Sequence, residues 1–403
     1  MNIILGLTGS VAASLAPKLV KRLLWMGKVV VIPTEKAKHF YEASDLEKLK
    51  SESDGRLSVF DDESEWHLWS KKGDPVQHID LRKWAHVMVI APLTANTLAK
   101  IAYGLCDNLL TSIVRAWDYE KPLILAPAMN TYMWEHPLTD AHLSVVRGLA
   151  RPRYDPMDAR TKSLLLLAMR ATRGRPLTVT VVDPASKILA CGDAGKGAMA
   201  DIDAIAEAIT SATRWRWPLA PPHFCNDFGL GLPIGNHPGA FGFSRRHDVH
   251  TGVDLYCSEN TVVEAMERGI VVKIEPFTGR KVIINGEPST WWNDTSVILV
   301  EGASGIVGYG EVIPLDGLKV GDEVKQGDAI ARVTPVLPEG KLRPDIPGHS
   351  RSMLHVELYS ELLDSSRGVC EVWKLGDPKP EKLLDPTSRL MEAKPAVVPC
   401  LRK

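Results

Sequence analysis

The chain contains 403 residues, 45% of them hydrophobic, and its 48 Lys and Arg residues nearly balance 49 Asp and Glu residues to a net charge of −1. At roughly 150 residues per domain, this length predicts two or three domains. The near-neutral charge provides no basic excess to attract phosphates, so nucleic acids and anionic membranes are excluded as general partners. Six cysteines without a CxxC pair exclude a disulfide scaffold, and we expect a cytoplasmic protein with reduced thiols.

No segment is expected to enter a membrane. The apolar run at 2–7 lacks the basic residues that precede the core of a signal peptide, and Gly6 and Gly9 interrupt the apolar stretch. The leucine-rich run at 164–169 is six residues long, far below the ~20 residues that span a bilayer. A strand, a glycine turn and a helix explain the first residues better.

Short apolar runs alternate with helical patterns in the first third of the chain. Strands are expected at 2–7, 28–33, 85–92 and 122–127, and helices at 11–27, 94–103 and 108–117. Continuous apolar runs are typical of strands buried on both faces of a parallel sheet. The alternation therefore predicts an open, Rossmann-like α/β sheet with helices on both faces. The turns after the strands lie at the carboxyl ends, where such sheets bind ligands.

The alternating pattern of strands and helices is interrupted at 148–181 and is replaced by a different pattern after 224. Residues 148–181 combine Arg-Pro clusters with a leucine run and have no sustained period, which predicts an atypical insertion. The proline-rich segment at 218–224 is the predicted domain boundary. Short strands between glycine turns follow it and indicate an all-β domain. We therefore expect domains at 1–214 and 225–365 and a loose tail at 366–403.

Four turns in the first domain carry polar or glycine-rich residues. The turn at 9–13 follows a strand and opens a helix, whose amides can hold an anion. The turns at 91–97 and 127–134 also follow a strand, and 190–200 is a glycine-rich loop around Cys191. Each signal is weak alone, since a lone cysteine is often a core residue and Asn130 is equally explained as a helix N-cap.

Taken together and in order, five segments carry a family resemblance. They are GSVAA, HIDLRKWA, APLTANTLAKIAYGLCDNLLTSIVRAW, PAMNTYMW and ACGDAGKGAMA. With them, residues 1–147 and 181–212 resemble the FMN-dependent cysteine decarboxylase family, whose members include enzymes that act on 4′-phosphopantothenoylcysteine in coenzyme A biosynthesis. The resemblance implies a homotrimer, a phosphorylated small-molecule substrate and an FMN pocket shared across subunits.

The resemblance also implies roles for individual residues. His78 and Cys191 are expected to be catalytic, and Asn130 is expected to bind the substrate carboxylate. The flavin supplies the electron sink that loss of CO₂ from a cysteinyl carboxylate requires, and Cys191 then donates a proton to the product. The residues expected to line the FMN are Gly9, Ser10, Val11, Thr34, Phe40, Thr94, Ala95, Asn96, Thr97 and Ala128.

One feature departs from this resemblance. The stretch between Trp134 and Cys191 is longer than the family pattern, and the surplus coincides with the aperiodic residues 148–181. We interpret it as either a dispensable surface loop or a retained intron in the gene.

The second domain carries a possible metal site. His250 and Asp254 lie four residues apart in the segment HTGVD, and His355 and Glu357 face the same way on a late strand. Two histidines and a carboxylate are a suitable ligand set for Zn²⁺, with one position left for water. HTGVD, GDEVKQGDAIARV and LHVEL resemble an M23-type zinc metallopeptidase domain, which implies that His250, Asp254 and His355 are the ligands.

Two positions of the M23 pattern are altered. Met353 and Glu311 stand where the resemblance implies acid–base histidines. Because acid–base help is typically worth ~10²–10⁴-fold, we expect a zinc-binding domain with weak or no peptidase activity. His247 and His349 are possible replacements, and a β-barrel without metal is the structural alternative. For the whole chain, the alternatives to a decarboxylase are a non-catalytic flavin-fold regulatory protein and a zinc metallopeptidase.

Overall fold

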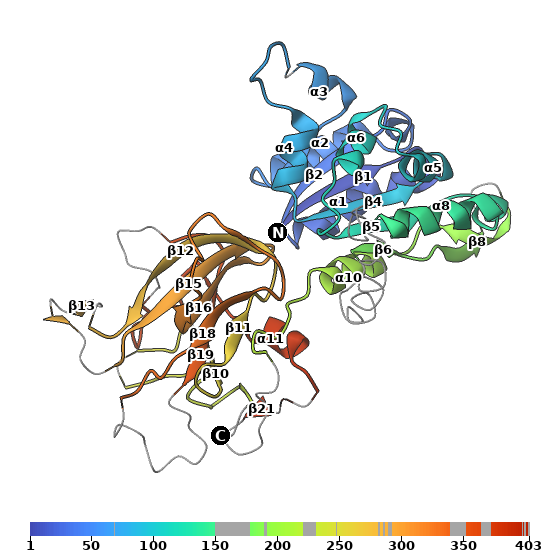
Figure 1. The fold of residues 1–403 in the computed structure, drawn as a ribbon. Helices are drawn as coiled ribbons and strands as arrows, with labels where there is room; N and C mark the ends of the chain where they lie inside the picture. Colours follow the sequence, from blue (N-terminus) through green and yellow to red (C-terminus); the bar gives the residue numbers. More distant parts are fainter. Residues whose placement is uncertain are drawn as a thin grey trace, which may run out of the picture. The chain divides into compact units, whose positions relative to one another are not determined.

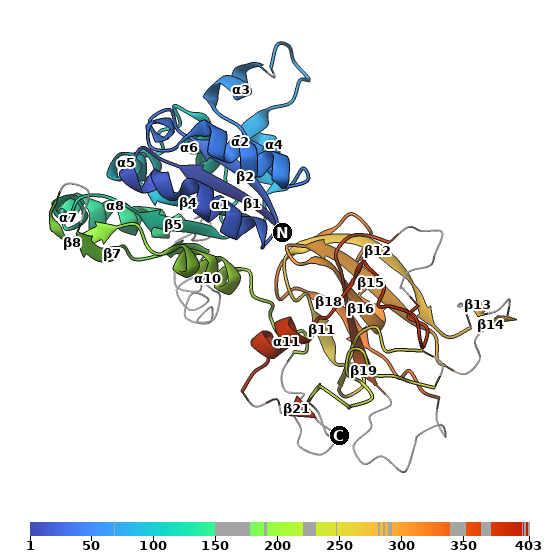
Figure 2. The same ribbon diagram turned by 180° about the vertical axis from the view of Figure 1, so that it is seen from behind.

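The structure, a computed structural model, describes residues 1–67, 69–149, 178–188, 192–220, 231–246, 248–280, 283–284, 287–288, 292–338, 352–363, 372–396, 398 and 400–401. It divides into an N-terminal unit, Met1–Thr213, and a C-terminal unit, Arg214–Lys403, and each is described by itself (Figures 1 and 2). The atypical stretch at 148–181 lies outside the described residues except at its ends. In the described ranges, no helix combines the length and the apolar character needed to cross a membrane.

The N-terminal unit is built on one six-stranded sheet with the order β3-β2-β1-β4-β5-β6. Its strands are β1 Asn2–Leu7, β2 Lys28–Pro33, β3 Leu57–Val59, β4 Val87–Leu93, β5 Leu123–Pro127 and β6 Val179–Val181. All the pairings are parallel, which confirms the expected open sheet. The chain moves outward from β1 to β3 and begins again at β4 on the other side of β1. The topological switch point therefore lies between β1 and β4.

Helices cover both faces of this sheet (Figure 1). They are η1 Val11–Leu15, α1 Ala16–Leu24, η2 Ala37–His39, α2 Ala43–Glu52, α3 Asp62–His67, α4 Gln77–Trp84, α5 Ala95–Tyr103, α6 Leu109–Arg115, α7 Thr131–Trp134, α8 Pro137–Gly148 and α10 Ile202–Ala212. Successive strand residues point to opposite faces. Leu5 therefore packs in a core cluster with residues of α1 and α10, whereas Ile4 packs in a second cluster with residues of α5, α6 and α8.

The first helix differs from its expected form. A continuous helix is predicted at 11–27, but the structure has a 3₁₀ turn, Val11–Leu15, followed by α1, Ala16–Leu24. Pro17 lies in the first turn of α1. A proline cannot donate a helical backbone hydrogen bond and is tolerated only where the first N–H groups have no partner, so the α-helix begins at this point.

The C-terminal unit is an antiparallel nine-stranded sheet with the main order β10-β19-β16-β15-β12-β17. Its strands are β10 Val253–Tyr256, β11 Val262–Glu264, β12 Gly269–Thr278, β15 Thr295–Gly302, β16 Gly305–Pro314, β17 Glu323–Val324, β18 Ala329–Val333, β19 Met353–Tyr359 and β20 Leu383–Leu384. Outside it lie the pairs β13 Ile283–Ile284 with β14 Glu287–Pro288 and β9 Leu232–Pro233 with β21 Cys400–Leu401. A second, predominantly β unit is thus present as expected.

The boundary between the units lies earlier than the proline-rich segment at 218–224. Trp215, Trp217 and Leu219 are buried in the core of the C-terminal unit, beside strands that begin more than thirty residues later. Large apolar side chains are stabilised by this burial. The second unit therefore begins before residue 225, the start expected from the prolines.

The expected loose tail at 366–403 contributes to the core in its described part. Helix α11, Thr387–Ala393, carries Leu390, which is fully buried, and Leu383 and Val398 are buried as well. The abundance of proline and lysine suggested a disordered segment. The apolar residues between them nevertheless pack against the sheet, and so the tail is part of the fold.

Leu390→Ala should lower the free energy of unfolding of the C-terminal unit by about 2–5 kcal/mol, because it leaves a cavity in the core. Native-state hydrogen exchange of the β15 and β16 amides measures this change. Met391 lies on the same helix and is 43% exposed, so Met391→Ala should cost less than about 0.5 kcal/mol. Equal effects of the two substitutions would contradict a core role for α11.

Candidate functional site

The loops after β1 and β4 are joined at the switch point of the N-terminal sheet. The Thr8 hydroxyl donates to the Pro92 carbonyl oxygen at 2.8 Å and accepts from the Thr94 N–H at 2.9 Å. Thr8 is fully buried. Because β1 and β4 are parallel neighbours, both loops leave the carboxyl edge of the sheet. They border the position where open α/β sheets bind their ligands.

The loop after β2 also packs against this position. The Thr34 N–H donates to the Leu7 carbonyl oxygen at 2.9 Å. A Cβ added to Gly9 would lie 2.6 Å from the Cβ of Lys36, so only glycine lets the two loops approach this closely. Ser10 and Thr94 accept hydrogen bonds from the first turns of η1 and α5. Three loops thus bring small polar residues to one edge of the sheet.

The residues predicted to line the FMN differ in how accessible they are. Exposed or half-buried are Gly9, Ser10, Val11, Thr34, Phe40, Thr94, Ala95 and Asn96, whereas Thr97 and Ala128 are buried. The Thr97 hydroxyl lies 3.2 Å from Thr94 Oγ1, and the Ala128 N–H donates to the Leu93 carbonyl oxygen. These two residues therefore hold the loops, and the others remain accessible to a ligand.

Asn130 has two partners at the carboxyl end of β5. Its side-chain oxygen accepts from the Tyr132 N–H at 2.9 Å and caps α7, and its Nδ2 donates to Asp193 Oδ2 at 2.7 Å. The N-cap interpretation of Asn130 is thus correct, and its amide nitrogen still reaches a carboxylate. Sequence reasoning missed Asp193, although it follows directly in the same CGD segment as Cys191. Cys191 itself lies outside the described residues.

Asp193 is positioned by a hairpin of β7, Ala185–Ile188, and β8, Ala194–Ala198. The Met129 N–H donates to the Gly197 carbonyl oxygen at 2.9 Å. A Cβ on Gly197 would lie 2.2 Å from the Met129 carbonyl oxygen, and one on Gly195 would lie 2.4 Å from Thr131 Oγ1. The glycines of this segment are therefore required for the close packing of the hairpin on the loop that carries Asn130.

His78 lies in helix α4, where its Nδ1 is 2.5 Å from Glu65 Oε1 of α3. Sequence reasoning missed Glu65, which lies in an acidic stretch with no other sign of function. Helix α4 and strand β8 lie at opposite ends of the N-terminal unit (Figures 1 and 2). The structure therefore does not bring His78 and Asn130 together within one subunit.

Residues 1–214 match the Flavoprotein family. The chain belongs to this family. It is 41% identical over 210 residues to phosphopantothenoylcysteine decarboxylase of Mus musculus, covering 52% of this chain and 85% of the relative. It is 42% identical over 218 residues to the enzyme of the same name from Oryza sativa subsp. japonica, covering 54% and 83%. These relatives confirm the resemblance that the five segments indicate.

A solved structure of a cysteine-to-serine mutant of PPC decarboxylase, complexed with pantothenoylaminoethenethiol, is 40% identical to the flavoprotein unit. The match covers 52% of this chain and 96% of the solved chain, with a TM-score of 0.43.

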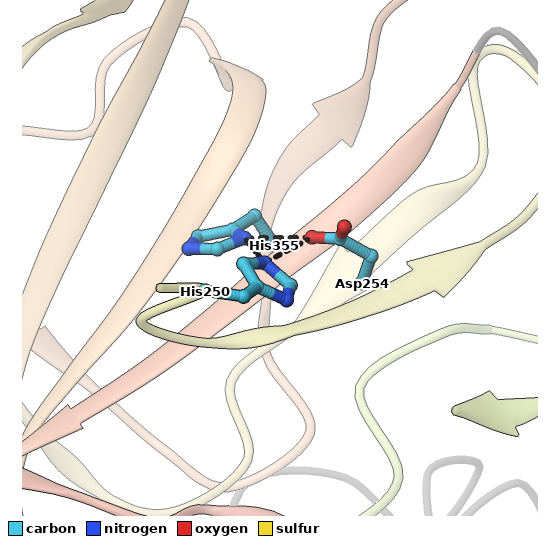
Figure 3. Close-up of side chains that lie close together, drawn as sticks. All are labelled: His250, Asp254 and His355. Carbon is cyan, nitrogen blue, oxygen red and sulfur yellow. Dashed lines mark hydrogen bonds and ion pairs between the residues drawn. The ribbon is translucent and has the colours of Figure 1, made fainter. Parts of the chain in front are cut away.

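Outside the flavoprotein unit, three buried side chains of the C-terminal unit converge (Figure 3). His355 Nδ1 lies 2.7 Å and His250 Nε2 lies 3.1 Å from Asp254 Oδ1. The two histidine nitrogens are 3.2 Å apart. The structure thus brings together all three predicted metal ligands. A cluster of two imidazole nitrogens and one carboxylate oxygen fits Zn²⁺ with one position left open.

The sheet places this triad through one strand pair. Asp254 of β10 is opposite His355 of β19 in the antiparallel register. A Cβ on Gly252 would lie 2.7 Å from His355 Nε2, so the preceding turn needs glycine to pass the ring. His355 Nε2 lies 3.2 Å from Glu357 Oε1, an ion-pair distance without hydrogen-bond geometry. The second nitrogen of His250 has a hydrogen-bond partner, since His250 Nδ1 is 2.9 Å from the Ala240 carbonyl oxygen. Metal-binding histidines are usually oriented in this way.

The charges of the triad depend on one another. Burial lowers the pKa of His355, but the carboxylates of Asp254 and Glu357 outweigh it and raise the pKa to about 10. Burial raises the pKa of Asp254, but the neighbouring histidines hold it well below its usual range. A proton on His355 therefore balances Asp254. A divalent cation that replaces this proton would balance the negative charge of Asp254 in the same way, since histidine binds metals after it has released its proton. His247 and His349 lie outside the described residues.

Gly197→Ala should loosen the β7–β8 hairpin, because its Cβ would meet the backbone oxygen of Met129. Overpacking of this kind costs about 1–3 kcal/mol, and we expect faster hydrogen–deuterium exchange in β7 and β8. Gly148→Ala is the matched control, since among the described residues no atom lies within 4 Å of its Cβ. Unchanged exchange in Gly197→Ala would show that the hairpin does not depend on this contact.

Proposed function

We propose that this chain is an FMN-dependent enzyme that decarboxylates 4′-phosphopantothenoylcysteine to 4′-phosphopantetheine in coenzyme A biosynthesis. The observation that carries the proposal is the 41% identity to the mouse decarboxylase across 85% of that protein. The chain also has His78, Asn130 and Cys191 at the positions that the resemblance assigns to the reaction. A regulatory flavoprotein without turnover has no need of these three residues, which favours the enzyme.

The loops after β1, β2 and β4 would hold the FMN at the switch point. When bound, the flavin supplies the electron sink that a cysteinyl carboxylate lacks. Asn130 Nδ2 already donates to a carboxylate, that of Asp193, and is suited to bind the substrate carboxylate. Glu65 orients His78 through Nδ1 and leaves Nε2 for the ligand. The Cys191 thiol donates a proton to the carbon from which CO₂ has left.

A homotrimer would complete this site. Helix α4, which carries His78, and helix α7, which Asn130 caps, lie at opposite ends of the N-terminal unit (Figure 2). A site that uses both residues therefore requires His78 of a neighbouring subunit to approach Asn130. We also propose a cytoplasmic location. In the described part of the chain neither Cys106 nor Cys257 forms a disulfide, which fits a reducing compartment.

The FMN-loaded protein, incubated anaerobically with 4′-phosphopantothenoylcysteine, should release CO₂ and accumulate 4′-phosphopantetheine. Cys191→Ser should form no phosphopantetheine, because the proposed role of the thiol follows CO₂ loss; CO₂ should stop once the bound flavin is reduced. Cys106→Ser, at an exposed cysteine, should behave as the wild type. Mass spectrometry of the products measures both species. A yellow wild-type protein that releases no CO₂ would favour the non-catalytic alternative.

For the C-terminal unit we propose a Zn²⁺ ion bound by His250 Nε2, Asp254 Oδ1 and His355 Nδ1. The convergence of these three atoms supports it. When bound, the ion supplies a Lewis acid with an open position. Met353 and Glu311 occupy the positions that the M23 resemblance assigns to acid–base histidines, so we propose weak or no peptidase activity.

Purified protein dialysed against Zn²⁺ should retain one ion per chain, measured by elemental mass spectrometry. Asp254→Ala should lose the ion, because the carboxylate is shared by both histidines. His39→Ala changes an exposed histidine of the other unit and should leave the content unchanged. At a hundredfold excess of Zn²⁺ over its Kd, binding should stabilise the C-terminal unit by about 2.7 kcal/mol. Equal zinc content in all three proteins would contradict this site.

A further inference from the structure

Strand β16 carries a bulge beside the triad. Ser296 of β15 pairs with Val312, and Ile298 pairs with Tyr309, so β16 has one residue more than β15 between these two pairs. Within the bulge, Glu311 has a φ of 63°, in the left-handed region that side chains other than glycine rarely adopt. Bulges often redirect a side chain next to a functional site.

The bulge turns Glu311 toward the face of the sheet that carries His355. Tyr309 and Val312 are three positions apart and would face opposite sides of a regular strand, yet both lie in the same core cluster. Gly310 and Glu311, between them, therefore both lie on the other face. Gly310 pairs directly with His355 of β19, so this is the face of the triad.

One oxygen of the half-buried Glu311 side chain lacks the partner that a buried polar atom normally has. Its Oε2 is buried and has no hydrogen-bond partner within the described part of the chain. Burial and the negative charge of Asp254 raise its pKa to about 8, against the opposing charges of His355 and Arg245. Its neighbour Gly310 is paired with His355 across the sheet, so Glu311 follows directly after the residue opposite this histidine. It is not one of the three residues whose ligand atoms lie within 4.8 Å of one another.

We propose that Glu311 is a positioning residue of the C-terminal metal site, whose Oε2 accepts a hydrogen bond from a water molecule held at the open side of His250, Asp254 and His355. The inference rests on the proposed zinc site. A buried acceptor with no partner needs a donor, and water is the donor that an open coordination position provides. The strained backbone of Glu311 fits this role, because strain of this kind concentrates at functional sites. Under this proposal, Glu311 contacts the metal-bound water from the position at which the M23 resemblance implies a histidine.

Glu311→Gln should bind Zn²⁺ about 10–100-fold more weakly than the wild type, as is typical when a group that is hydrogen-bonded to a metal-bound ligand is changed. Isothermal titration of the full-length apo protein with Zn²⁺ measures this. Glu301→Gln makes the same change at an exposed position of the neighbouring strand β15 and should bind as the wild type. The visible spectrum of the Co²⁺-loaded protein should change in Glu311→Gln and not in Glu301→Gln.

The variant Glu311→Gly tests the role of the carboxylate separately from the strain of the backbone. Glycine adopts a φ of 63° without strain, so this variant should have a stable apo fold and still bind Zn²⁺ more weakly. A residue with a purely structural role would instead lower apo stability in Glu311→Gln and leave affinity unchanged. Wild-type affinity, within twofold, in both variants would overturn the role of Glu311 alone. A wild-type protein that binds no Zn²⁺ would overturn the metal site together with it.

Discussion

One buried hydroxyl connects the two loops on which the flavoprotein site depends. Thr8 donates to Pro92 near the end of β4 and accepts from Thr94 directly after it, so the turns that leave β1 and β4 keep one relative position. Leaving a buried polar group unpaired costs about 1–3 kcal/mol, and separating the loops would leave Thr8 without either bond. Ser10 and Thr94 stand next to this connection and cap the helices that start there. The geometry of this edge is therefore set by the core beneath it.

The sequence predicted the centre of the flavoprotein sheet well and its periphery poorly. The strand expected at 28–33 has the same bounds in the structure, because a continuous apolar run buried on both faces leaves no other interpretation. Strand β3, Leu57–Val59, was missed, since three residues at the edge of a sheet carry no period. The partners of the site residues were missed as well. Asp193 reaches Asn130, and Glu65 reaches His78, through contacts between segments whose approach no local pattern encodes.

In the C-terminal unit the ligand set of the triad was predicted from the sequence, whereas the position of Glu311 beside it was not. The M23 resemblance of HTGVD and LHVEL predicted the set His250, Asp254 and His355. The antiparallel register of β10 and β19 brings Asp254 and His355 opposite each other. The face on which Glu311 lies depends on an inserted residue in β16, and alternation alone would have placed it on the opposite side. The unit to which Trp215 and Trp217 belong was also not evident from the sequence. They stand before a proline-rich segment that looked like a boundary, and their burial assigns them to the second unit.

The contact between Asn130 and Asp193 has a consequence for how ligands are admitted. Asp193 is an internal competitor: any carboxylate that approaches the same N–H of Asn130 has to displace a group that is covalently tethered and so present at high effective concentration. A small carboxylate such as acetate should compete poorly with Asp193 for Asn130, whereas a ligand that also binds the protein elsewhere can displace Asp193. Displacement of Asp193 removes one contact between the glycine-rich hairpin and the loop after β5, while the backbone hydrogen bond from Met129 to Gly197 remains. Occupancy at Asn130 and freedom of the segment that follows Cys191 are thereby thermodynamically linked.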